Sequence, residues 1–389
     1  MSTLFYIVEA AVKAVFVLFA IAFPLASLLI WQERKQSALI QDRLGPNRAF
    51  INLPFIRRFR FFGLLHLVAD SIKMFMKEDF MPAGARPFLF QMAPVLALAP
   101  VLLVFAVIPF GDTLLLYLPD KDLFYAVNLS VASLDTGLLF LLAVISLTVY
   151  GTVLAGYAPD SKPGMLGALR AGAQMFSYEA AMGLTVAGVL MVYGTMAIDH
   201  IARAQDSLVL GFLPAWGVVY QPLGALLFLI AATAETKRVP FDMPEGESEI
   251  VGYFVEYSAM KFGTFMFAEF LEVVAVAALL TVLFFGAYHL PWLSWNHHVI
   301  PWLTGLIGAH TVTPGLNIQV VSLVTALLQL LVFMAKVGFF CFLQLLVRWT
   351  LPRFRYDQLM DFGWKLLLPA AMINLALTAV AVLALGKAG

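Results

Sequence analysis

Cysteine and charge are both scarce in this chain of 389 residues. The one cysteine, Cys341, lies inside an apolar run, so it can form neither an intrachain disulfide nor part of a Cys-rich iron–sulfur site. Charged residues make up 12% of the chain and hydrophobic residues 62%, far outside the balance of soluble domains. The formal net charge is zero, which gives no support to a nucleic-acid partner. Together these features predict an integral membrane protein.

Sequence motifs for carrying electrons are also missing. The chain has no Gly-rich phosphate loop, no Cys-x-x-Cys and no pair of histidines inside an apolar run that could ligate a haem. We therefore expect this chain to bind no metal or flavin and to supply no catalytic residue of its own. Four histidines gather in one polar stretch, where a metal site is the alternative to a plain polar loop: His289, His297, His298 and His310.

Long apolar runs dominate what is present, and a run of roughly twenty residues is enough to cross a membrane. They lie near residues 5–31, 92–110, 135–157, 165–196, 208–233, 260–288, 317–347 and 364–386. The first run has no cleavage site and predicts a retained helix, not a signal peptide. The runs are too continuous for barrel strands, so no strands are expected. The predicted fold is an all-α integral membrane protein of about eight transmembrane helices, in a single membrane domain over residues 1–389.

Positive charge is concentrated in alternate loops. The loops near residues 32–91, 158–164, 234–259 and 348–363, with their flanking helix ends, carry 19 of the 24 Lys and Arg residues. The positive-inside rule assigns these loops to the cytoplasm. With an even number of helices, both termini are then predicted on the non-cytoplasmic side.

The first of these loops has helical patterning of its own. Phe55, Phe59 and Phe62 recur at helical spacing among arginines, which predicts an amphipathic helix in the membrane interface. Asp70 and Lys73 recur at the spacing that places side chains on one helix face, and Lys77 continues it. Contact with lipid headgroups is the alternative interpretation of the arginines.

Several acidic residues lie where a membrane protein solvates them poorly. A charge near the centre of the bilayer costs about 2.5–3.5 kcal/mol on insertion scales, so such residues usually face a cavity, a partner or an ion path. Buried carboxylates near one another are expected to have raised pKa values and can pass or hold protons near neutral pH. The alternative is that each acid pairs with a cation and fixes helix packing. The acids in question are Glu179, Glu235, Glu269 and Glu272.

The stretch after Glu235 combines breaks in the helix with apolar and acidic side chains. Pro240 and Pro244 interrupt helix, while Phe241 and Met243 supply apolar surface among the acids. Such a loop can line a pocket for an amphiphile with a polar head. A solvated acidic loop is the alternative.

Six charged motifs occur in order along nearly the whole chain. They are WQERKQSALIQDRLGPNR at 31–48, ADSIKMFMKED at 69–79, LGALRAGAQMFSYEAAMG at 166–183, AETKRVPFDMPEGESEIV at 234–251, FVEYSAMKFGTFMFAEF at 254–270 and LPRFRYDQLMDFGWKLLLP at 351–369. In these motifs the chain resembles the H-subunit (mitochondrial subunit 1) family of respiratory complex I, the proton-pumping NADH:quinone oxidoreductase.

This resemblance implies a membrane component without redox cofactors in a multisubunit translocase of the bacterial plasma membrane, with quinone as substrate. The implied partners are peripheral-arm iron–sulfur and quinone-site subunits, adjacent small membrane subunits, antiporter-like pumping subunits and membrane lipid. The implied quinone-chamber residues are Glu33, Arg34, Asp70, Lys73, Arg238, Phe241, Asp242, Glu245, Glu247 and Glu249. The implied proton-path residues are Glu78, Glu179, Glu235, Glu256 and Glu269, of which Glu256 and Glu269 are placed in the helix after the acidic loop.

The chain departs from the family at Glu272, which either extends the acidic path or pairs with a neighbour. Two other functions are weighed against complex I. A homologous anchor subunit of a membrane-bound hydrogenase is disfavoured by the complete PEGESE run at 244–249. A stand-alone proton-coupled transporter would have inverted repeats with broken helices in matching halves, and the sequence has no such symmetry.

Overall fold

The computed structural model describes residues 3–51, 60–118, 123–209, 212–244, 250, 252–307 and 314–384. Within these residues, seven helical segments are long and apolar enough to cross a membrane, and α9 (Pro222–Glu235) is a shorter apolar helix. The all-α integral membrane class is therefore confirmed. The long segments comprise α1 (Thr3–Phe16) with α2 (Phe23–Ile40), α4 (Pro87–Val104), α5 (Gly137–Tyr157), α6 (Lys162–Tyr193), α10 (Ala259–Phe284), α12 (Pro314–Thr350), and α13 (Tyr356–Asp361) with α14 (Leu368–Ala384).

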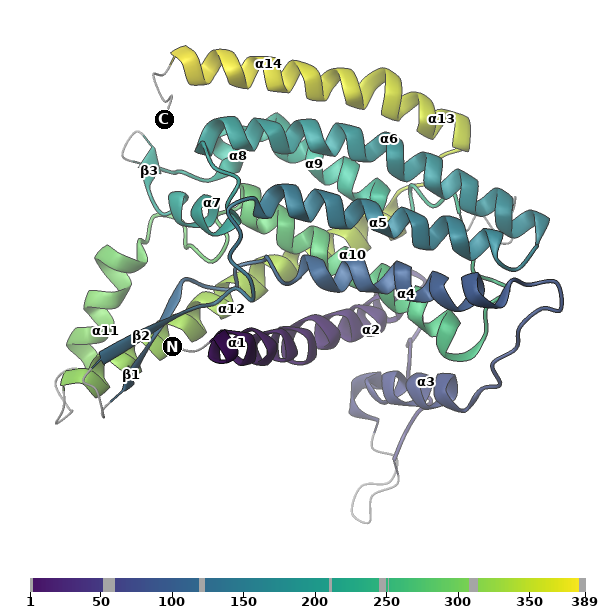
Figure 1. The fold of residues 1–389 in the computed structure, drawn as a ribbon, viewed down its shortest axis with the longest axis horizontal. Helices are drawn as coiled ribbons and strands as arrows, with labels where there is room; N and C mark the ends of the chain where they lie inside the picture. The colour runs from purple at the N-terminus through teal and green to yellow at the C-terminus, as the bar shows by residue number, and fades with distance from the viewer. Residues whose placement is uncertain are drawn as a thin grey trace.

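The helix α10 forms the centre of the bundle. Its membrane-length window is 89% buried, against 22% for the segment Tyr356–Ala384 that contains α14. Apart from Lys261, Glu269 and Glu272 its sequence is apolar on all sides, as expected for a helix with neighbours all round. It packs on α2, α4, α9 and α12. Figure 1 shows α14 on one flank of the bundle and α1 with α2 on the other, with α5, α6 and α9 between them.

Small residues allow close contact between helices. A Cβ atom on Gly151 of α5 would lie 2.5 Å from the backbone nitrogen of Ala97 in α4. No side chain fits at that distance, so glycine lets the two backbones touch. This close contact is typical of helix packing in membranes. No hydrophobic driving force holds helices together in lipid, so small residues that let the backbones pack closely stabilise the contact.

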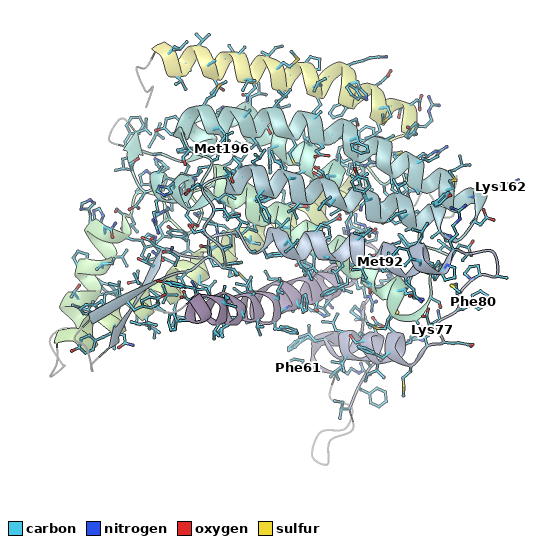
Figure 2. All side chains as sticks on the ribbon, viewed as in Figure 1. Phe61, Lys77, Phe80, Met92, Lys162 and Met196 are labelled. Atoms are coloured by element: carbon cyan, nitrogen blue, oxygen red, sulfur yellow. The ribbon has the colours of Figure 1, made fainter. Side chains whose placement is uncertain are left out.

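The two ends of the bundle differ in structure. Both termini lie at one end, together with α7 (Ile198–Ala204), α8 (Gly217–Tyr220) and α11 (Ile300–Ile307), whereas α3 (Leu65–Met76) lies toward the other end (Figure 1). Figure 2 places Lys77, Phe80 and Lys162 toward this second end and Met196 toward the first. The arrangement agrees with the predicted alternation of loops. Which end faces the cytoplasm stays a prediction.

The predicted end of the first helix is wrong. A π-helical segment, Val17–Ala22, joins α1 to α2, and the helix continues to Ile40 instead of ending near residue 31. Glu33 and Arg34 are therefore helical residues and not loop residues. Hydropathy marks where the apolar surface ends, but Gln, Glu, Arg, Lys, Ala and Leu after Trp31 are all strong helix formers.

The fifth apolar run is also not helical throughout. Helix was predicted over 208–233, whereas α9 begins only at Pro222, which occupies the first helical turn. Two short strands, β3 (Leu208–Val209) and β4 (Leu213–Pro214), form a hairpin before it. A second antiparallel hairpin joins β1 (Thr113–Leu118) to β2 (Leu123–Asn128), with Thr113 opposite Asn128. The expectation that the chain has no strands is therefore wrong. Short segments rich in Leu, Tyr and Phe have a high propensity for β-strands and can pair in the connections between the helices of the bundle.

The first loop contains one described amphipathic helix, α3. Val68, Ile72 and Phe75 follow one another at helical spacing and are all exposed, and no residue of α3 is fully buried. An exposed apolar stripe of this kind is typical of a helix in the membrane interface. Phe55, Phe59 and the arginines between them lie outside the described residues.

Candidate functional site

The helix α9 ends inside the protein. Its 14 residues span about 21 Å at 1.5 Å per residue, which is short of the roughly 30 Å hydrocarbon thickness. Glu235 is its last residue, and Thr236, Lys237 and Arg238 after it are also buried. Non-helical backbone at such depth is tolerated where protein covers it or where it lines a cavity. The charges of this segment therefore depend on protein partners.

Neighbouring helices hold the segment after α9. The side-chain amide of Gln174 in α6 donates to the carbonyl oxygens of Ala234 (2.6 Å) and Phe241 (2.7 Å). The ring of Phe241 stacks on Phe354 with a centroid distance of 5.7 Å and lies 5.9 Å from the ring of Tyr178. A solvated acidic loop is therefore the wrong interpretation for residues 236–244. Glu245, Glu247 and Glu249 lie outside the described residues.

Arg238, which follows α9, contacts two other helices through its guanidinium group. Its Nη1 lies 2.8 Å from Glu33 Oε2 in α2, and its Nη2 lies 3.8 Å from Glu269 Oε2 in α10. The guanidinium also covers the ring of Phe270 at 3.9 Å. From α12, Arg348 reaches the other oxygen of Glu33 at 2.7 Å. Breaking a buried ion pair on one side typically costs about 3–5 kcal/mol, so these residues fix how α2, α10 and α12 meet.

Two further contacts extend this cluster. Buried Asp242 pairs with Arg353 at 2.6 Å. The hydroxyl of Tyr253 donates to Glu269 Oε1 at 3.3 Å. Glu269 therefore has a cation on one oxygen and a hydroxyl on the other.

Glu235 lines a small cavity. The volume open to the centre of a water molecule is about 30 Å³, and a buried water needs roughly 10–15 Å³ on this measure. Glu272 faces the same cavity, and Lys237 Nζ lies 3.5 Å from Glu272 Oε2. Glu235 Oε1 has no hydrogen-bond partner among the described residues. The other lining groups are Val101, Val104, Ile145, Thr148, Met182, Phe228, Thr236, Ala275, Val276 and Leu279.

Glu179 of α6 accepts a short hydrogen bond from the Ser146 hydroxyl of α5. The ion pairs formed within the described residues include Glu33, Glu269 and Glu272, but neither Glu179 nor Glu235. The expectation that each acid pairs with a cation therefore holds for some of the acids and fails for these two.

A second, larger cavity of about 430 Å³ lies between the end of α2, α3 and the end of α12. Arg34 in its wall pairs with Asp70 of α3 at 2.5 Å. The indole nitrogen Nε1 of Trp349 is buried and has no hydrogen-bond partner among the described residues. The lining residues are Glu33, Arg34, Ser37, Arg43, Gly45, Pro46, His66 and Trp349.

Gly63 and His66 hold α3 against the segment after α2. Gly63 has φ +91°, and a Cβ atom there would lie 2.2 Å from the carbonyl oxygen of Pro46. Only glycine fits such a position. His66 Nε2 accepts hydrogen bonds from the backbone nitrogens of Arg48 and Ala49, both at 3.1 Å. These contacts build the wall of the larger cavity.

Three predicted site residues lie apart from this cluster. Lys73, Glu78 and Glu256 are exposed. The backbone carbonyl of Glu78 accepts from the Ser258 hydroxyl at 3.0 Å, but its side chain lies on the surface. The resemblance placed Glu256 in the helix of Glu269, which is wrong because α10 begins at Ala259.

Four residues of the site were missed from the sequence. Lys237 follows the end of a helix, a position where a cation is usually exposed to solvent. Arg348 and Trp349 stand at the end of an apolar run, where exposure to solvent is likewise the usual expectation. His66 has a usable signal in retrospect, because it is the one histidine in the first loop.

The histidine-rich stretch at the opposite end forms a polar site of another kind. Buried His289 has Nδ1 3.1 Å from Asp206 Oδ1, and Ser294 donates to Asp206 Oδ2 at 2.9 Å. Burial raises the pKa of Asp206, but the contacts with His289 and Ser294 outweigh it and hold that pKa below its usual value. No group of three potential metal ligands occurs among the residues that the structure describes. His297 and His298 line an open cavity of about 560 Å³, and His310 lies outside the described residues.

Comparisons with known proteins identify the family. The model of the NADH dehydrogenase family matches residues 12–379. The H subunit of NADH-quinone oxidoreductase from Bdellovibrio bacteriovorus is 40% identical over 380 residues, which is 93% of each chain. That of Flavobacterium psychrophilum is 39% identical over 379 residues, covering 97% of this chain and 98% of the relative. The chain therefore belongs to the NADH dehydrogenase family, among the H subunits of NADH-quinone oxidoreductase.

Proposed function

We propose that this chain forms the quinone-binding chamber and the first steps of the acidic proton path of a proton-translocating NADH-quinone oxidoreductase. The chain is a multi-pass membrane subunit of that enzyme, its partners are other subunits of the complex, and quinone is the complex's substrate. One observation carries the finer proposal. Arg238 lies between Glu33, which lines the larger cavity, and Glu269, which stands one helical turn from Glu272.

The larger cavity suits a quinone head. A quinone ring has two carbonyl oxygens that accept hydrogen bonds, and Trp349 Nε1 is a buried donor without a partner among the described residues. Arg34 adds a cation in the same wall. The helices α2, α3 and α10 pack on one another, and the exposed apolar stripe of α3 would face the lipid. A lipid quinone would enter between these three helices.

The electrons come from a partner, because the sequence supplies no set of cysteines for an iron–sulfur cluster. Reduction of one quinone takes two electrons and two protons and yields one quinol. Negative charge forming on the quinone would attract Arg34 and Arg238, weakening the hold of Arg238 on Glu269. A change in charge at one carboxylate shifts the protonation of its neighbours. Glu272, Glu235 and then Glu179 are the next carboxylates inward.

The sidedness follows from the positive-inside rule. The larger cavity lies at the bundle end that holds α3, which we assign to the cytoplasm. Both termini then lie on the other side of a bacterial plasma membrane.

Glu235→Gln in the assembled complex tests the proton path. The variant keeps the shape of the side chain but removes the titratable group, so we expect quinone reduction coupled to pumping to fall by on the order of tenfold or more, since groups that transfer protons typically contribute about 10²–10⁴-fold. NADH oxidation by an artificial acceptor that bypasses quinone should not change. Asp361→Asn is the matched control, because Asp361 is an exposed acid paired with Lys365. Wild-type turnover with a wild-type proton yield in Glu235→Gln would refute the role.

Purification in mild detergent tests the assembly. The chain should elute with iron–sulfur subunits and a nucleotide-binding subunit. A transporter would elute alone, and a hydrogenase-type complex would lack the nucleotide-binding subunit.

A further inference from the structure

We infer that Glu272 is a further proton-carrying carboxylate, joined to Glu235 through water in their shared cavity and positioned by Lys237. The inference rests on the proposed proton path and adds a step to it. Glu235 and Glu272 come from different helices, α9 and α10, and both line the cavity of about 30 Å³. That volume holds about two water molecules, so one water chain can contact both carboxyl groups.

The geometry of the Lys237 pair differs from that of a simple structural ion pair. Strong N⁺–H···O⁻ contacts are about 2.7–2.9 Å long, as between Arg238 and Glu33, whereas Lys237 Nζ lies 3.5 Å from Glu272 Oε2. This oxygen has no hydrogen-bond partner among the described residues. Both side chains are almost fully buried, at 4% and 12% exposed. The carboxylate thus lies near a cation, lines the cavity and has an oxygen without a hydrogen-bond partner among the described residues.

Hydroxyl groups of α5 complete the surroundings. Thr152 Oγ1 lies 3.5 Å from Lys237 Nζ, which gives the ammonium a second partner. Thr152 in turn donates to the carbonyl of Thr148, whose side chain lines the cavity. Charged or titratable neighbours of this site include Glu235 and Lys237, Glu179 on α6, and on α10 Glu269 with its partner Arg238. The Lys237 ammonium group can move from Glu272 toward the Thr152 hydroxyl when Glu272 becomes neutral.

The proposed step conserves atoms and charge. Protonated Glu235 gives its proton to a cavity water, and the water gives another proton to the carboxylate of Glu272. Glu235 is left negative and Glu272 neutral, so one proton has moved and no electron has been transferred. The reverse exchange returns it. Lys237 makes the negative state of Glu272 available without placing a direct hydrogen bond on the oxygen that must accept the proton.

The test uses the assembled complex in sealed vesicles, with quinone reductase rate and protons pumped per electron pair as readouts. Glu272→Gln removes the carboxyl but leaves Lys237 without its counter-ion. The double variant Glu272→Gln/Lys237→Gln removes both charges together. If Glu272 carries protons, coupled turnover falls at least about tenfold in both variants. If Glu272 only neutralises Lys237, the double variant recovers wild-type turnover and proton yield, which overturns the inference.

Two further variants keep the outcomes distinct. Glu272→Asp retains a titratable carboxyl on a shorter side chain. We therefore expect an assembled complex with slower turnover and a shifted pH–rate profile. This measurement tests the inference even if the Glu272→Gln complex fails to assemble. An unchanged profile in Glu272→Asp counts against the inference. Glu235→Gln is measured in parallel. Normal coupling in Glu235→Gln overturns the proposed path itself, whereas impaired coupling there with recovery in the double variant overturns only the role of Glu272.

Discussion

The contact between Arg238 and Glu33 should be measurable as a coupling energy. We consider Arg238→Gln, Glu33→Gln and the double variant of the full chain in mild detergent. In each single variant the remaining charge keeps a second partner. Glu33 keeps Arg348 at 2.7 Å, and Arg238 keeps Glu269 at 3.8 Å and the ring of Phe270.

The magnitude follows from burial and from these remaining partners. Removing one side of a buried ion pair typically costs about 3–5 kcal/mol because a charge is left without compensation. Here the charge is partly compensated, so we expect about 3 kcal/mol for each single variant, the lower end of that range. Residues in direct contact show coupling energies of about 0.5–3 kcal/mol. We expect the double variant to cost about 1.5 kcal/mol less than the sum of the two.

Cys341 provides the assay. It is the one cysteine of the chain and is buried in α12, so a thiol reagent labels it only when the structure opens. When reclosing is fast, such labelling reports the population of the open state. A loss of about 3 kcal/mol raises that population about a hundredfold, since every 1.4 kcal/mol is tenfold.

The exposed pair Arg355–Asp357 is the control, because its side chains are 68% and 60% exposed. Breaking such a surface pair should cost less than about 1 kcal/mol. If the costs of Arg238→Gln and Glu33→Gln add to within about 0.5 kcal/mol, the two side chains do not interact and the proposed link between cavity and carboxylates is lost.

Three further predictions follow from single sites. Trp349→Phe removes one N–H donor but keeps the aromatic surface, so KM for quinone should rise by about tenfold, the equivalent of one hydrogen bond of 1.4 kcal/mol, and an unchanged KM would exclude Trp349 from the chamber. Gly63→Ala forces a Cβ atom against Pro46 at positive φ, so quinone affinity should fall in a titration while NADH oxidation by an artificial acceptor stays normal. The pKa of Asp206 is held low in the folded protein, so its stabilising effect is complete above the unfolded pKa of about 3.9 and is lost as pH falls through the lower folded value. Asp206→Asn should therefore flatten the acid side of the Cys341 labelling profile.

The sequence predicted the fold wherever hydropathy decides structure. Membrane length predicted where the seven long helices lie, because lipid imposes that constraint directly, whereas the eighth predicted span corresponds to the shorter α9. Hydropathy did not predict where helices end. The first helix runs on to Ile40 on helix-forming polar residues, and the fifth run loses its first half to a hairpin and to Pro222. Those outcomes depend on local propensity and on packing.

The site was predictable in part for a related reason. Acids at membrane depth carry a cost that can be recognised in one sequence, and Glu235, Glu269 and Glu272 are indeed buried or nearly so. A Lys–Arg pair after a helix usually indicates that both side chains are exposed to solvent. No local sequence pattern reveals that Arg238 contacts Glu33, 205 residues away in sequence. Glu78 and Glu256 show the opposite case. The family motifs predicted both as proton-path residues, whereas the fold leaves both side chains exposed.

The pairing of charges in the site determines at which carboxylate the uptake of a proton changes the net charge of the site. The three cations Arg238, Arg348 and Lys237 pair with Glu33, Glu269 and Glu272, so this set is neutral when all six groups are charged. Each of those carboxylates lies beside a cation that offsets its negative charge. Glu235 and Glu179 have no such partner among the described residues, and protonation there alters the local charge without breaking an ion pair. We therefore expect Glu235 to take up a proton first, and Glu269 to exchange one only when charge on the quinone draws Arg238 away.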